Sequence, residues 1–176
     1  GAAFLLYSAI LWIALGLLEP RDDVRRPGRI LSLVIAVAVF CQALLGGLVA
    51  GTDAGLAYNT WPLMDGGFVP GGLFIQNPTW TNFFENTATV QFQHRLGAYV
   101  VTGLILLFWA RMARQRLTPG AGQAVNLLVC ALLLQMGLGI ATLLSVVWLP
   151  LAALHQAGAL ALLTAALFAA HRLRVA

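Results

Sequence analysis

The sequence predicts an all-α integral membrane protein: a four-helix transmembrane bundle made of two repeated hairpins and preceded by a truncated transmembrane helix. Three observations predict this fold class. The 176 residues are 60% hydrophobic and only 9% charged, which is too apolar for the surface of a soluble domain of this length. Five long apolar runs follow one another along the chain. A short polar motif also recurs in the two hairpins that the last four runs predict.

The opening run, residues 1–18, is marginally short for a membrane span, so we expect the tail of a preceding transmembrane helix. It has neither a basic leader nor an obvious cleavage site, which favours a truncated or processed start over a signal peptide. Residues 19–29 are expected to form a cytoplasmic loop and residues 30–176 a four-helix transmembrane domain. The four complete spans are expected at about residues 30–52, 87–111, 123–147 and 150–171. At about 1.5 Å per residue, each can cross a hydrocarbon core about 30 Å thick.

The arginines predict the orientation of these helices. All ten basic residues are arginines, and each except Arg95 falls in one of three clusters. The clusters are Arg21, Arg25, Arg26 and Arg29; Arg111, Arg114 and Arg116; and Arg172 with Arg174. The predicted spans place all three clusters on one side of the membrane, which the positive-inside rule makes the cytoplasmic or matrix side. Because the clusters form no continuous basic face, we expect membrane lipid and not nucleic acid as a partner.

The opposite loop, residues 53–86, contains no Lys or Arg and is rich in aromatic residues, prolines and glycines. Aromatic side chains favour the boundary between lipid and water. We therefore expect this segment to lie as an interfacial cap over the outer end of the bundle.

An internal repeat links the two predicted hairpins. The motif reads Gln-x-x-x-Gly on the outgoing helix and His-x-x-Gly-Ala on the return helix. It occurs at Gln42, Gly46, His94, Gly97 and Ala98, and again at Gln135, Gly139, His155, Gly158 and Ala159. Both copies start and end on the inner side, so they are expected to be parallel repeats related by an axis along the membrane normal.

The repeat makes His94 and His155 equivalent, and each lies one to two turns from the outer end of its predicted helix. A two-fold axis would bring the two side chains toward each other at one depth. Polar groups inside a bilayer are costly and generally functional. Two imidazoles that approach from opposite sides suit the axial positions of a haem iron, so His94 and His155 are the predicted iron ligands.

Simpler interpretations of the same residues exist. Each histidine could form only an interhelical hydrogen bond, with the small residues allowing close helix packing. A zinc site is less favoured because zinc takes three or four ligands, and the acidic residues lie in loops or near the membrane boundaries.

Neighbouring residues extend the predicted haem site. Gly97 and Gly158 lie on the same helical faces as the histidines, where a missing side chain would leave space for a flat macrocycle. Gly46 and Gly139 could do the same on the adjacent helices. Gln91, one turn before His94, could donate a hydrogen bond that supports the site. The same role is open to Gln93, Gln156, Gln42 and Gln135. The alternative for each glutamine is a hydrogen bond between helices. Arg95 could pair with haem propionates or extend to the outer head groups.

Residues 46–66 read GGLVAGTDAGLAYNTWPLMDG, and they are followed by Glu85-Asn86, Gln91-Phe-Gln93-His94-Arg95 and Leu154-His155-Gln156. This combination resembles the haem A synthase family of cytochrome oxidase assembly, in its proteobacterial and mitochondrial form. Nearly the whole chain takes part in the resemblance. Family members have two similar four-helix halves, and this chain resembles the second half preceded by the tail of the fourth helix.

The resemblance implies a function for the chain. The second half in this family holds haem b between two histidines, which correspond to His94 and His155, and residues 30–176 would be that haem-binding domain. The first half binds the substrate haem O and carries the catalytic residues, so no catalytic residue is expected in this chain. The intact enzyme is an oxidoreductase that converts the C8 methyl of haem O to a formyl group, making haem A for cytochrome c oxidase. The fragment alone is expected to be inactive.

The resemblance also implies a multi-pass protein of the bacterial inner membrane, or of the mitochondrial inner membrane in a eukaryote. Expected partners are haem O, an unidentified electron donor, a second copy of the protein and haem O synthase. The residues themselves leave two other functions open. One is a bis-histidine cytochrome b that transfers electrons, with quinone as a candidate partner, and the other is a cofactor-free membrane assembly subunit.

Overall fold

The computed structural model describes residues 1–18 and 28–173. Most of the predicted cytoplasmic loop, including Arg21, Arg25 and Arg26, lies outside the described residues, as does Arg174. The described residues form helices and no strands, which confirms the predicted fold class.

Within residues 1–18 and 28–173, four helices are long and apolar enough to cross a membrane: α2 (Arg29–Gly51), α5 (Thr87–Met112), α6 (Pro119–Leu144) and α7 (Leu149–Arg172). The apolar helix α1 (Ala2–Leu18) is shorter. Between α2 and α5 the chain forms three short helical segments, α3 (Ala54–Ala57), η1 (Thr79–Thr81) and α4 (Asn82–Glu85).

Local side-chain chemistry explains where the long helices begin. Asn86 caps α5 by accepting a hydrogen bond from the Thr89 amide, and Thr118 caps α6 by accepting one from the Ala121 amide. Gly28 precedes α2 with φ 91°, and a Cβ there would lie 2.7 Å from the Met112 sulfur. Only glycine therefore fits this position without strain.

Helix α6 differs from its predicted span of residues 123–147. It begins at Pro119 and ends at Leu144. Thr118 with Pro119 forms a favourable helix start that hydropathy alone does not reveal. At the other end, Val146 and Val147 adopt φ values of 54° and 57°, which terminate the helix before its apolar sequence ends.

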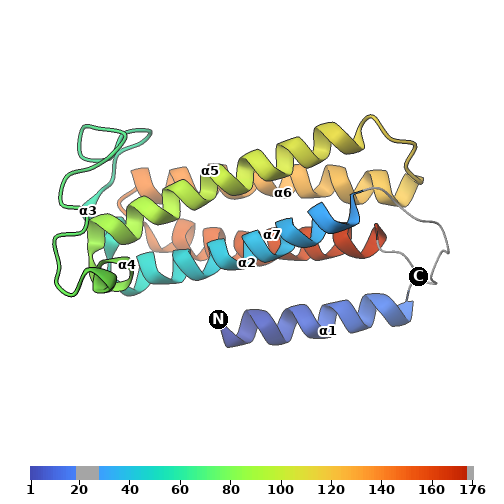
Figure 1. The fold of residues 1–176 in the computed structure, drawn as a ribbon, viewed down its shortest axis with the longest axis horizontal. Helices are drawn as coiled ribbons and strands as arrows, with labels where there is room; N and C mark the ends of the chain where they lie inside the picture. The colour runs from blue at the N-terminus through green and yellow to red at the C-terminus, as the bar shows by residue number, and fades with distance from the viewer. Residues whose placement is uncertain (19–27, 174–176) are drawn as a thin grey trace.

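The four long helices form a square bundle, with α2 and α6 each packed on both α5 and α7. Helices α2 and α6 therefore face each other across the bundle, as do α5 and α7. These are the pairs that the internal repeat makes equivalent. Figure 1 shows that α1 lies outside the bundle, against α7, and that the segment between α2 and α5 covers one end, which we call the outer end.

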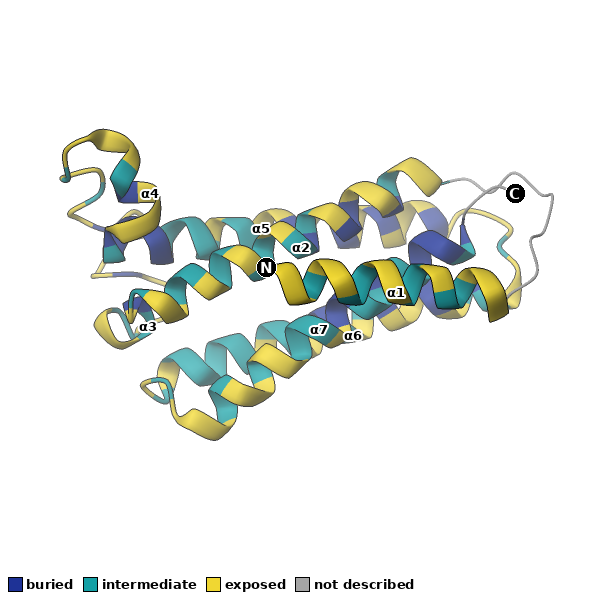
Figure 2. Ribbon diagram, turned by 90° about the horizontal axis from the view of Figure 1, so that it is seen from below, coloured by how far each residue is buried: buried dark blue, intermediate teal, exposed yellow. Residues whose placement is uncertain are grey.

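The core is concentrated in the half of the bundle away from the outer end. The last buried residue of α2 is Val39 and that of α6 is Leu132, while the first buried residue of α7 is Leu162. In Figure 2 the dark blue positions of these helices gather at the inner end, and the outer halves are teal and yellow. A bundle closed along its whole length would bury inward side chains at every level. The residues of α2, α6 and α7 are therefore less buried in the outer half of the bundle than in the inner half.

The outer loop, residues 53–86, is ordered by the buried side chain of Asn82. Its amide nitrogen donates to the carbonyls of Gln76 and Thr79, both at 2.9 Å, and its oxygen accepts from the Gln76 amide and the Asn86 side chain, both at 3.0 Å. Several aromatic residues of the loop stay exposed, including Phe68 at 77% and Trp80 at 63%. Exposed aromatic residues at one end of an apolar bundle are consistent with the predicted interfacial cap.

The substitution Asn82→Ala removes these four hydrogen bonds. We expect a loss of about 1–3 kcal/mol in stability, because buried backbone groups lose their partners. Lower thermal unfolding midpoints in detergent and faster protease cleavage within residues 53–86 would show it. Asn126→Ala is the control, since Asn126 is exposed and accepts one hydrogen bond, from Trp109. Equal behaviour of the two variants would contradict this account of the loop.

Candidate functional site

His94 and His155 lie on the facing helices α5 and α7, at similar distances from the starts of these helices. His94 follows the start of α5 by seven residues and His155 follows the start of α7 by six. With a rise of 1.5 Å per residue, these offsets correspond to depths of about 10 Å and about 9 Å below the outer ends of the helices. Both histidines lie in the outer half of the bundle, where the residues of α2, α6 and α7 are exposed or only partly buried.

In the first hairpin, Gln42 on α2 contacts His94 on α5. The Gln42 amide nitrogen donates to the His94 carbonyl at 2.9 Å and to the His94 Nδ1 at 3.0 Å. A Cβ on Gly97 would collide with the Gln42 Oε1, and a Cβ on Gly46 would lie 3.2 Å from the His94 Cε1. Gly97 thus makes room for the amide and Gly46 makes room for the imidazole. We call this arrangement the first His–Gln pair.

The second hairpin repeats this geometry between α6 and α7. The Gln135 amide nitrogen donates to the His155 carbonyl at 3.0 Å. A Cβ on Gly158 would collide with the Gln135 Oε1, and one on Gly139 would lie 2.8 Å from the His155 Cε1. This is the second His–Gln pair. It differs from the first in one respect, since the buried Nδ1 of His155 has no hydrogen-bond partner.

The role of the glycines differs from the sequence-based expectation. The sequence predicts that Gly97 and Gly158 leave space for a macrocycle. In the structure, glutamine amides occupy the space beside both residues. The imidazoles likewise occupy the space beside Gly46 and Gly139. The physical reason is that a glutamine in an apolar interior needs a polar partner, and the histidine helix supplies one where a missing side chain admits the amide. Direct contact of these glycines with a cofactor stays a prediction.

Gln91 and Arg95 bind the outer loop. The Gln91 side chain donates to the Tyr58 carbonyl at 2.9 Å. The two terminal nitrogens of Arg95 donate to the carbonyls of Leu63 at 3.1 Å and Tyr58 at 3.2 Å. These bonds fasten the loop to α5 beside His94, a role that the sequence did not suggest. A direct role of Gln91 or Arg95 toward a cofactor stays a prediction.

A pocket of about 180 Å³ lies between the outer loop and α5. Its lining comes from Pro62, Met64, Phe68 and Val69 of the loop and from Phe92, Arg95, Leu96 and Tyr99 of α5. Leu96 is two residues from His94, and a two-residue step turns a helix by about 200°. The pocket is therefore on the side of α5 that faces away from the histidine.

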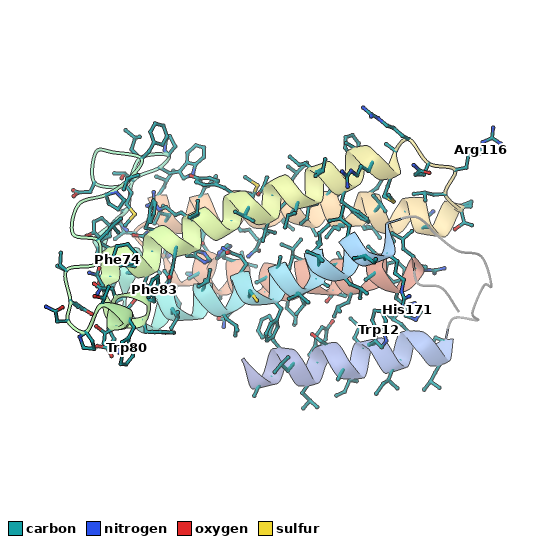
Figure 3. The ribbon with its side chains drawn as sticks, in the orientation of Figure 1. Trp12, Phe74, Trp80, Phe83, Arg116 and His171 are labelled. Atoms are coloured by element: carbon teal, nitrogen blue, oxygen red, sulfur yellow. The ribbon has the colours of Figure 1, made fainter. Side chains whose placement is uncertain are left out.

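His171, the third histidine, is remote from this site. It is buried near the inner end of α7, where its ring packs edge-on against Trp12 of α1 at 5.4 Å between centroids. Figure 3 shows Trp12 and His171 at the opposite end of the molecule from Phe74, Trp80 and Phe83 of the outer loop. Its predicted position, away from the other two histidines, is confirmed.

Among the described residues, no group of three or more His, Cys, Asp or Glu side chains could hold a metal ion. A zinc ion at His94 and His155 would therefore find two protein ligands instead of the three or four that it takes. Haem iron needs only two axial ligands, because the porphyrin supplies the other four nitrogens. The described donor set fits haem better than a bare metal ion.

Comparison with known proteins identifies the family of the chain. The family described as cytochrome oxidase assembly protein matches residues 1–167. The chain belongs to this family. A haem A synthase of Nitrosospira multiformis is 48% identical over 179 residues, which cover 99% of this chain and 50% of that protein.

Two further relatives of this cytochrome oxidase assembly family are also haem A synthases. The one from Sinorhizobium medicae is 46% identical over 165 residues, covering 92% of this chain and 44% of its own length. The one from a Chelativorans species is 49% identical over 171 residues, covering 92% and 45%. The chain therefore spans about half the length of the relatives it matches. No solved structure matches it.

The contact between Gly139 and His155 gives a direct test of the second His–Gln pair. Gly139→Ala is expected to destabilise the chain by about 1–3 kcal/mol, because the new methyl group overpacks the imidazole. Gly137→Ala on the same helix meets nothing within 4 Å and is expected to be neutral or stabilising by up to about 1 kcal/mol. Thermal unfolding in detergent measures both. Equal unfolding midpoints would show that the imidazole does not occupy this space.

Proposed function

We propose that His94 and His155 are the two axial ligands of one haem b in the outer half of the bundle. The observation that carries the proposal is that two imidazoles, equivalent by the internal repeat, lie on facing helices at similar distances from the helix starts. Bundle interiors of this kind are where haem groups are held by facing helices. Haem b bound at this position would act as a one-electron carrier.

The residues of this chain would bind and shield that group. The apolar helices exclude water from the sides, and the outer loop covers the end of the bundle near the histidines. Gln91 and Arg95 hold the loop there through the carbonyls of Tyr58 and Leu63. Arg95 is also the proposed partner for the propionates, because its guanidinium is the nearest cationic group to His94 in the sequence.

We propose further that the chain is the cofactor half of a haem A synthase. The named relatives and the half-length match support this assignment. The intact protein would oxidise the C8 methyl of haem O to a formyl group, producing haem A for cytochrome c oxidase. The other half would supply the catalytic residues and most of the haem O site, so the chain alone would not catalyse the reaction. The bacterial relatives favour the plasma membrane as its location, and a second copy and haem O synthase are proposed partners.

The test is reconstitution of the 176-residue chain with haem b in detergent. We expect a low-spin absorption spectrum that is lost in His94→Ala and in His155→Ala, because each substitution removes an axial ligand. His171→Ala is the matched control, since His171 lies near the inner end of α7, and it is expected to keep the low-spin spectrum. A low-spin spectrum that survives in either of the first two variants would refute the ligand assignment. Failure of the unsubstituted chain to bind haem would refute the cofactor.

A further inference from the structure

Each histidine of the site is accompanied by one glutamine, and the geometry points to a specific role for both amides. We propose that Gln42 and Gln135 are positioning residues whose side-chain oxygens accept the Nδ1 hydrogen of His94 and His155 when these histidines bind iron. This inference rests on the proposed function.

The Oε1 atoms of Gln42 and Gln135 are both buried and have no hydrogen-bond partner. The nitrogens of the same amides are used in both hairpins, donating to the histidine carbonyls. Buried acceptors without donors are rare in folded proteins. The same acceptor oxygen lacks a hydrogen bond in both repeats. This indicates that another state of the protein provides a donor for it in each repeat.

An imidazole that binds iron through Nε2 carries its proton on Nδ1, and that N–H is ordinarily hydrogen-bonded to an acceptor. The Nδ1 of His155 is buried and has no partner. The Nδ1 of His94 lies 3.0 Å from the Gln42 amide nitrogen, which pairs only with an unprotonated Nδ1. Both histidines therefore lack an acceptor for the hydrogen that iron binding places on Nδ1.

One small motion satisfies both requirements. Rotation of the terminal amide exchanges its oxygen and nitrogen, and this brings the orphaned oxygen of Gln42 toward the His94 Nδ1. The amide nitrogen then loses its bond to the His94 carbonyl. That carbonyl still accepts the helical bond from the amide four residues later, so the backbone is not left unsatisfied.

The glycines keep the glutamines in reach of the histidines. A Cβ on Gly97 would collide with the Gln42 Oε1, and a Cβ on Gly158 with the Gln135 Oε1. Only a residue without a side chain at these positions admits the amide beside the histidine helix. The two glycines that the sequence associated with the cofactor therefore act on it through the glutamines.

The test measures haem b affinity and reduction potential in the 176-residue chain. Gln42→Met and Gln135→Met remove the acceptor at similar volume, and each is expected to lower haem affinity roughly 10- to 100-fold. The potential is expected to rise, because an imidazole without a hydrogen bond at Nδ1 donates less charge to ferric iron. Gln123→Met is the matched control on α6, at an exposed position, about 18 Å along the helix from Gln135, and it is expected to change neither quantity.

Gln42→Glu separates the acceptor role from a packing role. It keeps an acceptor oxygen and loses the N–H donor, so we expect a potential at or below that of the unsubstituted chain and higher haem affinity than in Gln42→Met. Should Gln42→Met fail to fold, Gln135→Met and Gln135→Glu give the same comparison in the second pair.

Two results would overturn the inference alone. One is an unchanged potential in the methionine variants that bind haem, and the other is identical behaviour of the Met and Glu variants, which would assign the effect to the lost N–H donor. If the unsubstituted chain binds no low-spin haem, the proposed function fails and this inference fails with it.

Discussion

The structure depends on the need to pair polar side chains inside an apolar bundle. Four polar side chains, Gln42, His94, Gln135 and His155, lie on membrane-spanning helices, where no bulk water satisfies them. Within each hairpin, the glutamine amide of one helix donates a hydrogen bond to the backbone carbonyl of the histidine on the next helix. The glycines of the motif allow these contacts, because a methyl group at any of the four positions would crowd the partner side chain.

This pairing divides the bundle into two parts with different roles. The inner half is closed by apolar side chains, among them Phe108, Ile105 and Leu128, which are fully buried. The outer half contains the two His–Gln pairs, and its inward positions on α2, α6 and α7 are only partly buried. The inner half therefore provides most of the packing energy.

Much of this architecture could be predicted from the sequence. Hydropathy located α2, α5 and α7 to within one or two residues, since apolar runs of membrane length have few alternatives to a helix. The repeat predicted that His94 and His155 lie on facing helices at one depth. The limits of α6 were wrong because the Thr118 cap and the left-handed Val146 and Val147 act independently of hydropathy.

Other parts of the site left no pattern in the sequence. The partners of Arg95 and Gln91 are backbone carbonyls, which any residue type carries, so nothing in the sequence marked Tyr58 or Leu63 as acceptors. The repeat showed that Gln42 and His94 occur in one motif. It did not show that their side chains contact each other. Which glycine admits which side chain depends on how two helices pack, and only the three-dimensional structure shows that the amides occupy the space assigned to a macrocycle.

The proposed site requires two imidazoles of one chain to bind one iron. Pulsed electron paramagnetic resonance on the ferric, haem-loaded chain tests it most directly, with ¹⁵N-labelled histidine as the only labelled residue. The chain has three histidines, and we expect coupling of the iron to the nitrogens of two of them. Coupling to a single histidine, or to none, would contradict it.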